Sequence, residues 1–266
     1  MVDLQSGWPS LLSNHNLSEK KIMRFAITAA LFTTALLCAP ALAQNVTPAI
    51  AAAVADAGRP DADKERDAAR KPAEAVAFAG VKPGMVVGEL GPGRGYYTRI
   101  LAKAVGPTGK VYAILTPAQA ARPGVLDGLN ALAAVYPNIK VVTSEYPALM
   151  LPEKTDLFWT TENYHDFHNG PTADIAALNK TVFNNLRQGG IFYVEDHSAA
   201  TGAGLAATSA FHRMDEDVAK SELIAAGFKL DGEGQFLRNP ADNKAASNSE
   251  TGHFASERFM LRMKRS

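Results

Sequence analysis

Three alternate glycines follow a short apolar run near residue 90, and this segment constrains the fold more than any other part of the chain. The sequence over Val86–Arg99 reads VVGELGPGRGYYTR, with the glycines at Gly91, Gly93 and Gly95. Glycine lets the backbone turn sharply and approach a ligand closely because it has no Cβ. A helix that begins just after such a turn offers unpaired backbone N–H groups. The pattern predicts a strand, a tight turn and a helix N-terminus against which a cofactor can bind.

The sequence on either side of the glycines completes a strand–helix–strand unit. A turn (KPGM, 82–85) precedes the first apolar run, and the apolar residues after Gly109 follow the expected helix as a second strand. The pattern continues to alternate, with strands expected near 85–90, 110–115, 139–144, 155–161 and 190–196 and helices near 96–105, 117–135 and 172–187. This alternation predicts a parallel sheet covered by helices on both faces.

The last part of the chain has a different pattern. Asp215 can cap a helix that ends at Gly227. Strands expected over 229–237 and 258–263 flank a polar loop, as in an antiparallel hairpin. The expected fold class is therefore α/β, with a Rossmann-like, doubly wound, mostly parallel seven-stranded sheet and an antiparallel C-terminal hairpin.

The N-terminal region carries an export pattern. Basic residues precede an apolar run over 25–38, and the small residues at 41–43 suit cleavage before Gln44. A buried N-terminal helix, or a lipid anchor on Cys38, is the alternative. We expect export to the periplasm and four regions, which are a non-native or disordered extension (1–22), a signal peptide (23–43), a helical lead-in (44–80) and the Rossmann-like domain (81–266).

Composition limits the partners more than it limits the fold. The chain has 266 residues, of which 47% are hydrophobic, and this is enough for one sizeable globular domain. Its 27 basic and 27 acidic residues balance, so neither nucleic-acid binding nor stable membrane insertion is expected. Cys38 is the only cysteine and lies in the expected signal peptide, so the mature chain would form no disulfide. The oligomeric state leaves no signal in the sequence.

Several segments together resemble the class I S-adenosylmethionine (SAM)-dependent methyltransferases over roughly residues 68 to 266. The acid–Leu–Gly–Pro–Gly–x–Gly run that begins at Glu89 matches the first motif of that superfamily. Four later segments resemble its adenine-side acidic motif, its fourth and fifth strands and its late helix end, namely Ser144–Pro147, Thr155–Phe158, Arg187–Phe192 and Ala225–Phe228. More narrowly, residues 66–74, 163–166 and 196–197 resemble a bacterial family of exported predicted methyltransferases.

The resemblance implies SAM as the cofactor and assigns its contacts by position. Glu89 and the loop of Gly91, Gly93 and Gly95 would lie near the amino-acid moiety, with Glu145 near the adenine. Tyr97 could line the cofactor or pack in the core. An alternative role for Glu89 is to organise the loop by accepting backbone N–H groups.

Two departures from the superfamily pattern affect this transfer. Many relatives have an acid at the end of the second strand that binds both ribose hydroxyls, whereas this chain has Thr116, which can offer only a weaker neutral hydrogen bond. Arg94 inside the glycine loop is also unusual. Its guanidinium could pair with the cofactor's carboxylate or simply face solvent.

Methyl transfer needs alignment and a deprotonated acceptor, so one base in a dry pocket suffices. Polar residues follow the fourth and fifth strands, at the edge where open α/β sheets bind ligands. We expect His165 or Asp166 to be the base. In the alternative interpretation, Asp166 caps a short helix and His165 packs beneath the loop.

The same region permits a metal, although no metal site is assigned. His165, His168 and Asp196 could bind a divalent ion, or His197 could replace one of them. The spacing is not diagnostic, and hydrogen-bonding histidines are the preferred interpretation.

The expected function is SAM-dependent methyl transfer to a small-molecule or protein acceptor. SAM is made in the cytoplasm, so an exported enzyme would need the cofactor delivered to it. Two alternative functions therefore stay open. One is a non-catalytic module that binds a small ligand on the same fold. The other is a metal-dependent hydrolase or lyase that uses His165, Asp166, His168, Asp196 and His197.

Overall fold

The computed structural model describes residues 46–171, 173–252 and 254–266. The expected N-terminal extension (1–22), the expected signal peptide (23–43) and Cys38 lie outside these ranges, so their assignments stay predictions. Of the helices in the described ranges, none is both long enough and apolar enough to cross a membrane.

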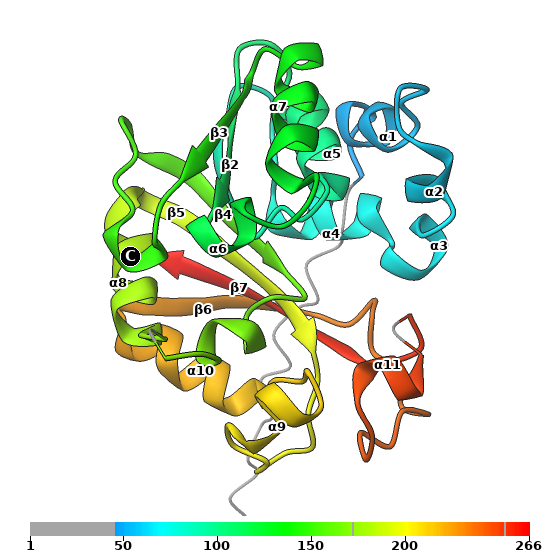
Figure 1. Cartoon of the computed structure of the whole chain (residues 1–266), viewed down its shortest axis with the longest axis vertical. Helices are drawn as coiled ribbons and strands as arrows, with labels where there is room; N and C mark the ends of the chain where they lie inside the picture. Colours follow the sequence, from blue (N-terminus) through cyan, green and yellow to red (C-terminus); the bar gives the residue numbers. More distant parts are fainter. Residues whose placement is uncertain (1–45, 172, 253) are drawn as a thin grey trace, which may run out of the picture. The chain divides into compact units, whose positions relative to one another are not determined.

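A seven-stranded sheet organises the described chain (Figure 1). The strands lie in the order β3-β2-β1-β4-β5-β7-β6. The first five pair in parallel, and β7 runs antiparallel to both of its neighbours. This arrangement confirms the expected fold class. The strand bounds are β1 Val86–Leu90, β2 Lys110–Leu115, β3 Ile139–Thr143, β4 Thr155–Thr161, β5 Leu186–His197, β6 Phe228–Gly234 and β7 Arg258–Arg265.

Helices cover both faces of the sheet, as the alternating pattern predicts. One apolar core lies between the sheet and the helices α1, α4, α5 and α7, and a second lies between the sheet and α8 and α10. Successive residues of a strand point to opposite faces, so Val111 belongs to the first core and Tyr112 to the second. The helix bounds are α1 Pro48–Val54, α4 Pro72–Ala79, α5 Tyr96–Val105, α7 Val125–Val135, α8 Ile175–Asn185 and α10 Glu216–Ala225.

Some helix boundaries differ from the sequence-based expectation. The helix expected over 117–135 is two helices, α6 (Pro117–Ala120) and α7. Gly124, the N-cap of α7, has a φ of 71°, a left-handed conformation that a continuous helix cannot contain. Asp215 caps α10 as expected, with its side chain accepting the Asp217 N–H. The loop between β5 and α10 carries the short helix α9 (Ala206–Ala210), and the hairpin loop between β6 and β7 carries α11 (Asn248–Thr251).

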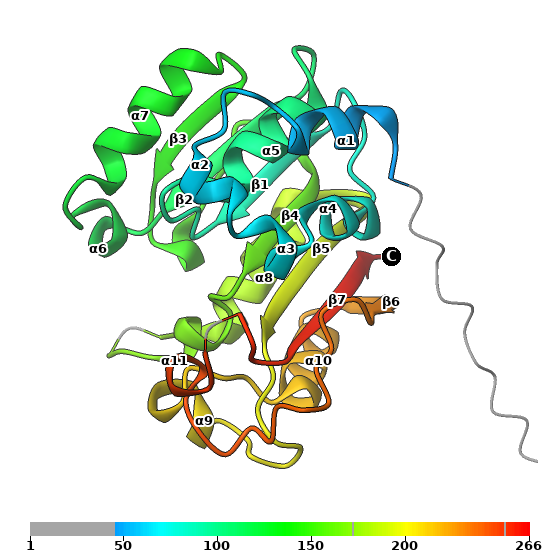
Figure 2. The same cartoon turned by 90° about the vertical axis from the view of Figure 1, so that its right-hand side faces the viewer.

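The expected lead-in folds as four helices, of which α2 (Asp61–Lys64) and α3 (Asp67–Arg70) are single turns. Figure 2 shows these helices lying across one face of the sheet beside α5. Arg59, with a side chain that is 0% exposed, holds α3 in place. Its guanidinium donates two hydrogen bonds, of 2.6 and 2.7 Å, to the carboxylate of Asp67. Such bidentate pairs fix the orientation of α3, and Asp63 of α2 pairs with Arg99 of α5.

Candidate functional site

The loop between β1 and α5 has the backbone that its glycines permit. Gly91, Gly93 and Gly95 have φ values of 65°, 57° and 85°, which side chains rarely tolerate. A Cβ on Gly95 would lie 2.9 Å from Leu132 Cδ2, so this glycine serves close packing against α7. A Cβ on Gly93 would meet nothing within 4 Å. Bare backbone therefore borders open space at the middle of the loop.

That open space is a cleft of 490 Å³, which we call the glycine-loop cleft. The glycine loop and Glu89 border it on one side, and α2 and α3 border it on the other. Its lining includes Gly91, Gly93, Tyr97, Arg70, Glu162 and Asn163. The structure thus brings four of the expected cofactor residues, Glu89, Gly91, Gly93 and Tyr97, to one cleft. Gly95 lines neither this cleft nor the next one.

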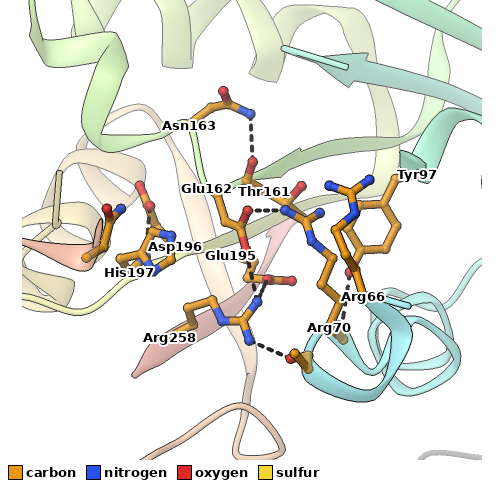
Figure 3. A network of polar contacts seen from close by, with 12 residues as sticks. Arg66, Arg70, Tyr97, Thr161, Glu162, Asn163, Glu195, Asp196, His197 and Arg258 are labelled. Carbon is orange, nitrogen blue, oxygen red and sulfur yellow. Dashed lines mark hydrogen bonds and ion pairs between the residues drawn. The ribbon is translucent and has the colours of Figure 1, made fainter. Parts of the chain in front are cut away.

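A second cleft of 530 Å³, the adjacent cleft, lies past the ends of β2, β3 and β4. Thr116 and Glu145, the expected ribose and adenine contacts, both line it, and so does Asp166. Asn163 lines both clefts. Its side-chain amide donates to the carbonyl oxygens of Thr161 (2.6 Å, drawn in Figure 3) and Gly91 (3.2 Å). The two clefts therefore meet at a fixed side chain between β4 and the glycine loop.

The expected bases lie at the start of η2 (His165–His168), just after β4. His165 is buried, and its Nδ1 lies 2.8 Å from Asp196 Oδ1. Asp166 is half-exposed, with Oδ1 3.4 Å from His165 Nε2 and 3.6 Å from His212 Nδ1. The structure therefore assembles His165, Asp166 and His212, which we call the His–Asp group. Sequence reasoning missed His212 because it follows β5 in a long loop.

The alternative metal set is not assembled in the described residues. His168 uses Nδ1 to contact the Tyr164 carbonyl oxygen and Nε2 to contact Glu222, each at 3.0 Å. His197 Nδ1 lies 2.5 Å from the Ser256 hydroxyl. Both histidines are therefore hydrogen-bonded within the protein, which is the interpretation that the sequence favoured for them.

Protein-family models give no match to the chain, and no curated protein matches it by sequence. Solved structures do match. A SAM-dependent methyltransferase from Aquifex aeolicus superposes with a TM-score of 0.55 at 19% identity, covering 78% of this chain and 99% of that one. A second SAM-dependent methyltransferase, from Mesorhizobium loti, superposes with a TM-score of 0.52 at 18% identity, and the match covers 74% of this chain and 98% of that one. An arsenic(III) S-adenosylmethionine methyltransferase from Chlamydomonas reinhardtii superposes with a TM-score of 0.51 at 18% identity, and the match covers 82% of this chain and 73% of that one.

The chain has the SAM-dependent methyltransferase fold. The strand order and the antiparallel β7 agree with these matches along most of each chain. In this fold the two clefts lie beyond the carboxyl ends of β1 to β4, where open α/β sheets bind ligands.

Glu89 lies at the base of the methyltransferase-fold glycine loop. Burial raises the pKa of its carboxyl group to about 7, against smaller opposing effects of the Thr98 hydroxyl and Arg99. The Thr98 hydroxyl donates a 2.6 Å hydrogen bond to it from the first turn of α5. Glu89 therefore joins the end of β1 to the start of α5 and also borders the cleft.

Thr116, the expected ribose contact, is already engaged. Its hydroxyl oxygen accepts the Gln119 N–H as the N-cap of α6, and the Gln119 side chain accepts the Thr116 N–H. Tyr146, which belongs to the segment that resembles the adenine-side motif but was given no contact of its own, lies beside them. It is buried and donates a 2.6 Å hydrogen bond to Gln119 Oε1. An aromatic ring thus lines the adjacent cleft next to the exposed Glu145.

Tyr97 and Arg94 differ in their surroundings although both line the glycine-loop cleft. Tyr97 is buried, its ring centroid lies 4.8 Å from that of Trp159, and its hydroxyl donates to the Arg70 carbonyl oxygen. The core position that sequence reasoning weighed therefore coexists with the lining position. Arg94 is exposed at the tip of the loop.

A buried ionic network lies beside the glycine-loop cleft (Figure 3), and two of its residues, Arg70 and Glu162, line the cleft. Glu162, at the end of β4, forms ion pairs with Arg70 of α3 and with Arg258 of β7. Arg258 also lies 3.4 Å from Glu195 and donates a 2.6 Å hydrogen bond to the Ala69 carbonyl oxygen. Burial and the neighbouring Glu162 raise the pKa of Glu195 to about 7, against the opposing effect of Arg258.

Glu162 itself adopts a left-handed φ of 56°. A non-glycine residue pays conformational energy for this backbone, and such strain gathers at functional sites. The two arginines hold the residue in that conformation. Sequence reasoning missed the network because Arg70 and Arg258 lie 92 and 96 positions from Glu162 in the chain.

Proposed function

We propose that this protein is a SAM-dependent methyltransferase, with SAM across the two clefts and the acceptor beside the His–Asp group. One observation carries the proposal. An open glycine backbone borders one cleft, Asp166 and His212 of the His–Asp group border the other, and the two clefts share Asn163. The methyltransferase fold provides the frame, at 18–19% identity to the structures named above.

The residues present fit SAM at several points. The open space at Gly93 accepts close approach of a ligand, and the backbone N–H groups at the start of α5 can bind a carboxylate. Thr116, Glu145 and Tyr146 would hold the adenosine part. Because no acid follows β2, we expect modest affinity for the ribose. When bound, SAM supplies an electrophilic methyl group on its sulfonium.

The protein's part in the transfer is to align the acceptor and remove its proton. In the metal-free protein, Asp166 is the base that lines the adjacent cleft, and the buried His165 lies behind it with Nε2 3.4 Å from Asp166 Oδ1. Burial lowers the pKa of His165, but the carboxylates of Asp196, Asp166 and Glu162 together outweigh burial and raise it, which makes the imidazole a stronger base. Asp196 also orients the ring, and Asp166 is the exposed group within reach of an acceptor.

Calorimetric titration with SAM and with S-adenosylhomocysteine tests the proposal. We expect micromolar dissociation constants, and a Gly93→Leu variant should lose binding by about 2 kcal/mol or more, a factor of about 30. Gly106→Leu is the matched control. Gly106 lies at the other end of α5, with a φ of 68° and nothing within 4 Å of its Cβ position. Equal binding by both variants, or no binding by the parent protein, would contradict the proposal.

Ligand binding without turnover is the second candidate function. Thr116 stands where many relatives have a ribose-binding acid, and its hydroxyl is already engaged as the cap of α6. Weaker binding of the cofactor favours this second function. Incubation with methyl-labelled SAM and an extract of candidate acceptors separates the two, since only a methyltransferase transfers the label.

We also propose that the protein is exported, on the export pattern over 23–43. The N-terminal sequence of the secreted protein should begin at Gln44 or a near neighbour. Retention of residues 23–43 in the mature protein would contradict this proposal.

A further inference from the structure

Three side chains with metal-ligand atoms converge at the mouth of the adjacent cleft. They are His165, Asp166 and His212, and their candidate ligand atoms all lie within 4.8 Å of one another. Two of the three separations are 3.4 Å, from His165 Nε2 to Asp166 Oδ1, and 3.6 Å, from His212 Nδ1 to the same oxygen. Across the described ranges 46–171, 173–252 and 254–266, this is the one His/Cys/Asp/Glu group with such convergence.

We propose that the His–Asp group binds a divalent transition-metal ion such as Zn²⁺. Ligand atoms bound at about 2.1 Å to a tetrahedral ion lie about 3.4 Å from one another. The two measured separations agree with that edge. Two imidazoles and one carboxylate are ligands that suit Zn²⁺, Fe²⁺ or Mn²⁺ and not Ca²⁺ or Mg²⁺, which prefer oxygen.

The contacts of Asp196 provide an independent argument. This carboxylate is fully buried at the end of β5 (Figure 3) and accepts the backbone N–H groups of His165 and His197. It also lies 2.8 Å from His165 Nδ1. A buried carboxylate that accepts Nδ1–H leaves Nε2 with its lone pair, and Nε2 is the nitrogen that faces Asp166. Carboxylate–histidine pairs of this kind orient the ligands of many protein metal sites.

The backbone at His212 supports the same conclusion. His212 has a left-handed φ of 49°, although it is not glycine, and its side chain is 54% exposed. Its neighbours anchor it. The buried Arg213 pairs with Asp242, and Asn248 of α11 donates to the His212 carbonyl oxygen. Because the His212 ring is exposed, its strained backbone does not serve packing of the core. A role as a metal ligand would explain why the strain is kept.

The site is placed to act on an acceptor. Asp166 and His212 both line the adjacent cleft, which meets the glycine-loop cleft at Asn163. Three protein ligands leave a fourth position for a substrate atom, as in catalytic zinc sites. This step rests on the proposed function, whereas metal binding does not. A hydroxyl or thiol acceptor bound to the ion would lose its proton to solvent more readily. Its lone pair would then form the new bond to the methyl carbon, and the S–CH₃ electrons would return to sulfur.

Metal binding can be measured without any activity assay. The full chain, purified without a histidine tag and dialysed against a chelator, is titrated calorimetrically with Zn²⁺. Visible absorption after loading with Co²⁺ reports the coordination. We expect one ion per chain, and a loss of affinity of at least about tenfold in His212→Ala and in Asp166→Asn. Both side chains are exposed, so these variants should fold. His168→Gln, a change at a histidine outside the group, should bind as the parent does.

The outcomes separate this inference from the proposed function. Gly93→Leu should lose SAM and keep Zn²⁺, whereas His212→Ala should keep SAM and lose Zn²⁺. Substoichiometric binding by the parent protein, or parent-like affinity in both His212→Ala and Asp166→Asn, would overturn the metal site. Zinc binding without SAM binding would support the metal site and remove the proposed function.

Discussion

Two buried acids, Glu89 and Glu162, line the glycine-loop cleft and are held in different ways. Glu89 is held between β1 and α5 by Thr98, and Glu162 is held between α3 and β7 by two arginines. Burial favours the neutral form of the Glu89 carboxyl group, whereas Glu162 is held by ion pairs with two arginines. These two acids line the same cleft and are therefore expected to respond differently to substitution.

Stability should depend on pH through Glu89. The unfolded chain releases this proton near 4.5, whereas the folded protein keeps it up to about 7. The folded state therefore holds the extra proton in between, and its stability falls as pH rises from 4.5 to about 7. Glu89→Gln mimics the neutral acid. The parent should lose unfolding free energy relative to this variant across that window, by at most about 1.4 kcal/mol per pH unit.

Urea unfolding at several pH values measures the difference, with Glu65→Gln, at an exposed carboxylate, as the control. A parent protein that gains stability relative to Glu89→Gln as pH rises from 4.5 to 7 would show the opposite sign and contradict the assignment.

Glu162→Gln should destabilise the protein. The change removes a charge from between Arg70 and Arg258, whose side chains are only 10% and 2% exposed. Loss of one partner from a buried ion pair costs about 3 kcal/mol. Urea unfolding measures it, and Glu233→Gln, in a more exposed pair with Lys220, should cost less than about 1 kcal/mol. Equal costs for the two variants would show that burial of the network does not matter.

At the scale of elements, the single-turn helices α2 and α3 depend on side chains for their position. Four-residue helices are not stable by themselves. Arg59 and Tyr96 both bind Asp67, so α3 is tied to the chain before α2 and to the first residue of α5. Arg66 and Arg70 also lie over the Tyr96 ring, at 4.7 and 4.8 Å from its centroid. The wall of the glycine-loop cleft is thus attached to the helix that follows the glycines.

Asp67→Ala should loosen this wall. The substitution leaves the Arg59 guanidinium buried without its carboxylate, at a cost of about 3 kcal/mol or more, whereas Tyr96→Phe removes one hydrogen bond at about 1 kcal/mol. Hydrogen exchange should accelerate over residues 48–71 in Asp67→Ala more than in Tyr96→Phe, and SAM affinity should fall in the same order. Unchanged exchange in both variants would mean that α2 and α3 are held by other contacts.

For the whole molecule, the clefts lie at one edge of the sheet, while a third cavity of 580 Å³ lies at the far end of α5. It is lined by residues such as Gly106, Val135 and Asn138. S-adenosylhomocysteine should therefore slow hydrogen exchange around 91–95, 116–119 and 161–166 and leave 103–109 and 135–140 unchanged. Protection at the far cavity instead would place the ligand at the wrong end of the sheet.

The sheet could be predicted from the sequence because hydrophobic periodicity and turn residues are local signals. The glycine loop, the strand alternation and the Asp215 cap were all of this kind, and the structure confirms these elements. The split at Gly124 was missed although Pro123 and Gly124 signal it locally. The roles of His212 and of the partners of Glu162 could not be found, because they depend on contacts between distant segments and on left-handed backbone at non-glycine positions.

The position of β7 also sets an order of assembly. Synthesis runs from the N-terminus, so this strand is made after every other strand of the sheet, yet its arginines donate to carbonyl oxygens of the first helices, Arg258 to Ala69 and Arg262 to Phe78. Until β7 inserts between β5 and β6, Glu162 lacks one of its two cations and the early helices lack two of their anchors. A nascent chain would thus hold an incomplete ionic network beside the glycine-loop cleft until β7 has been made and paired, so ligand capture would follow that late pairing.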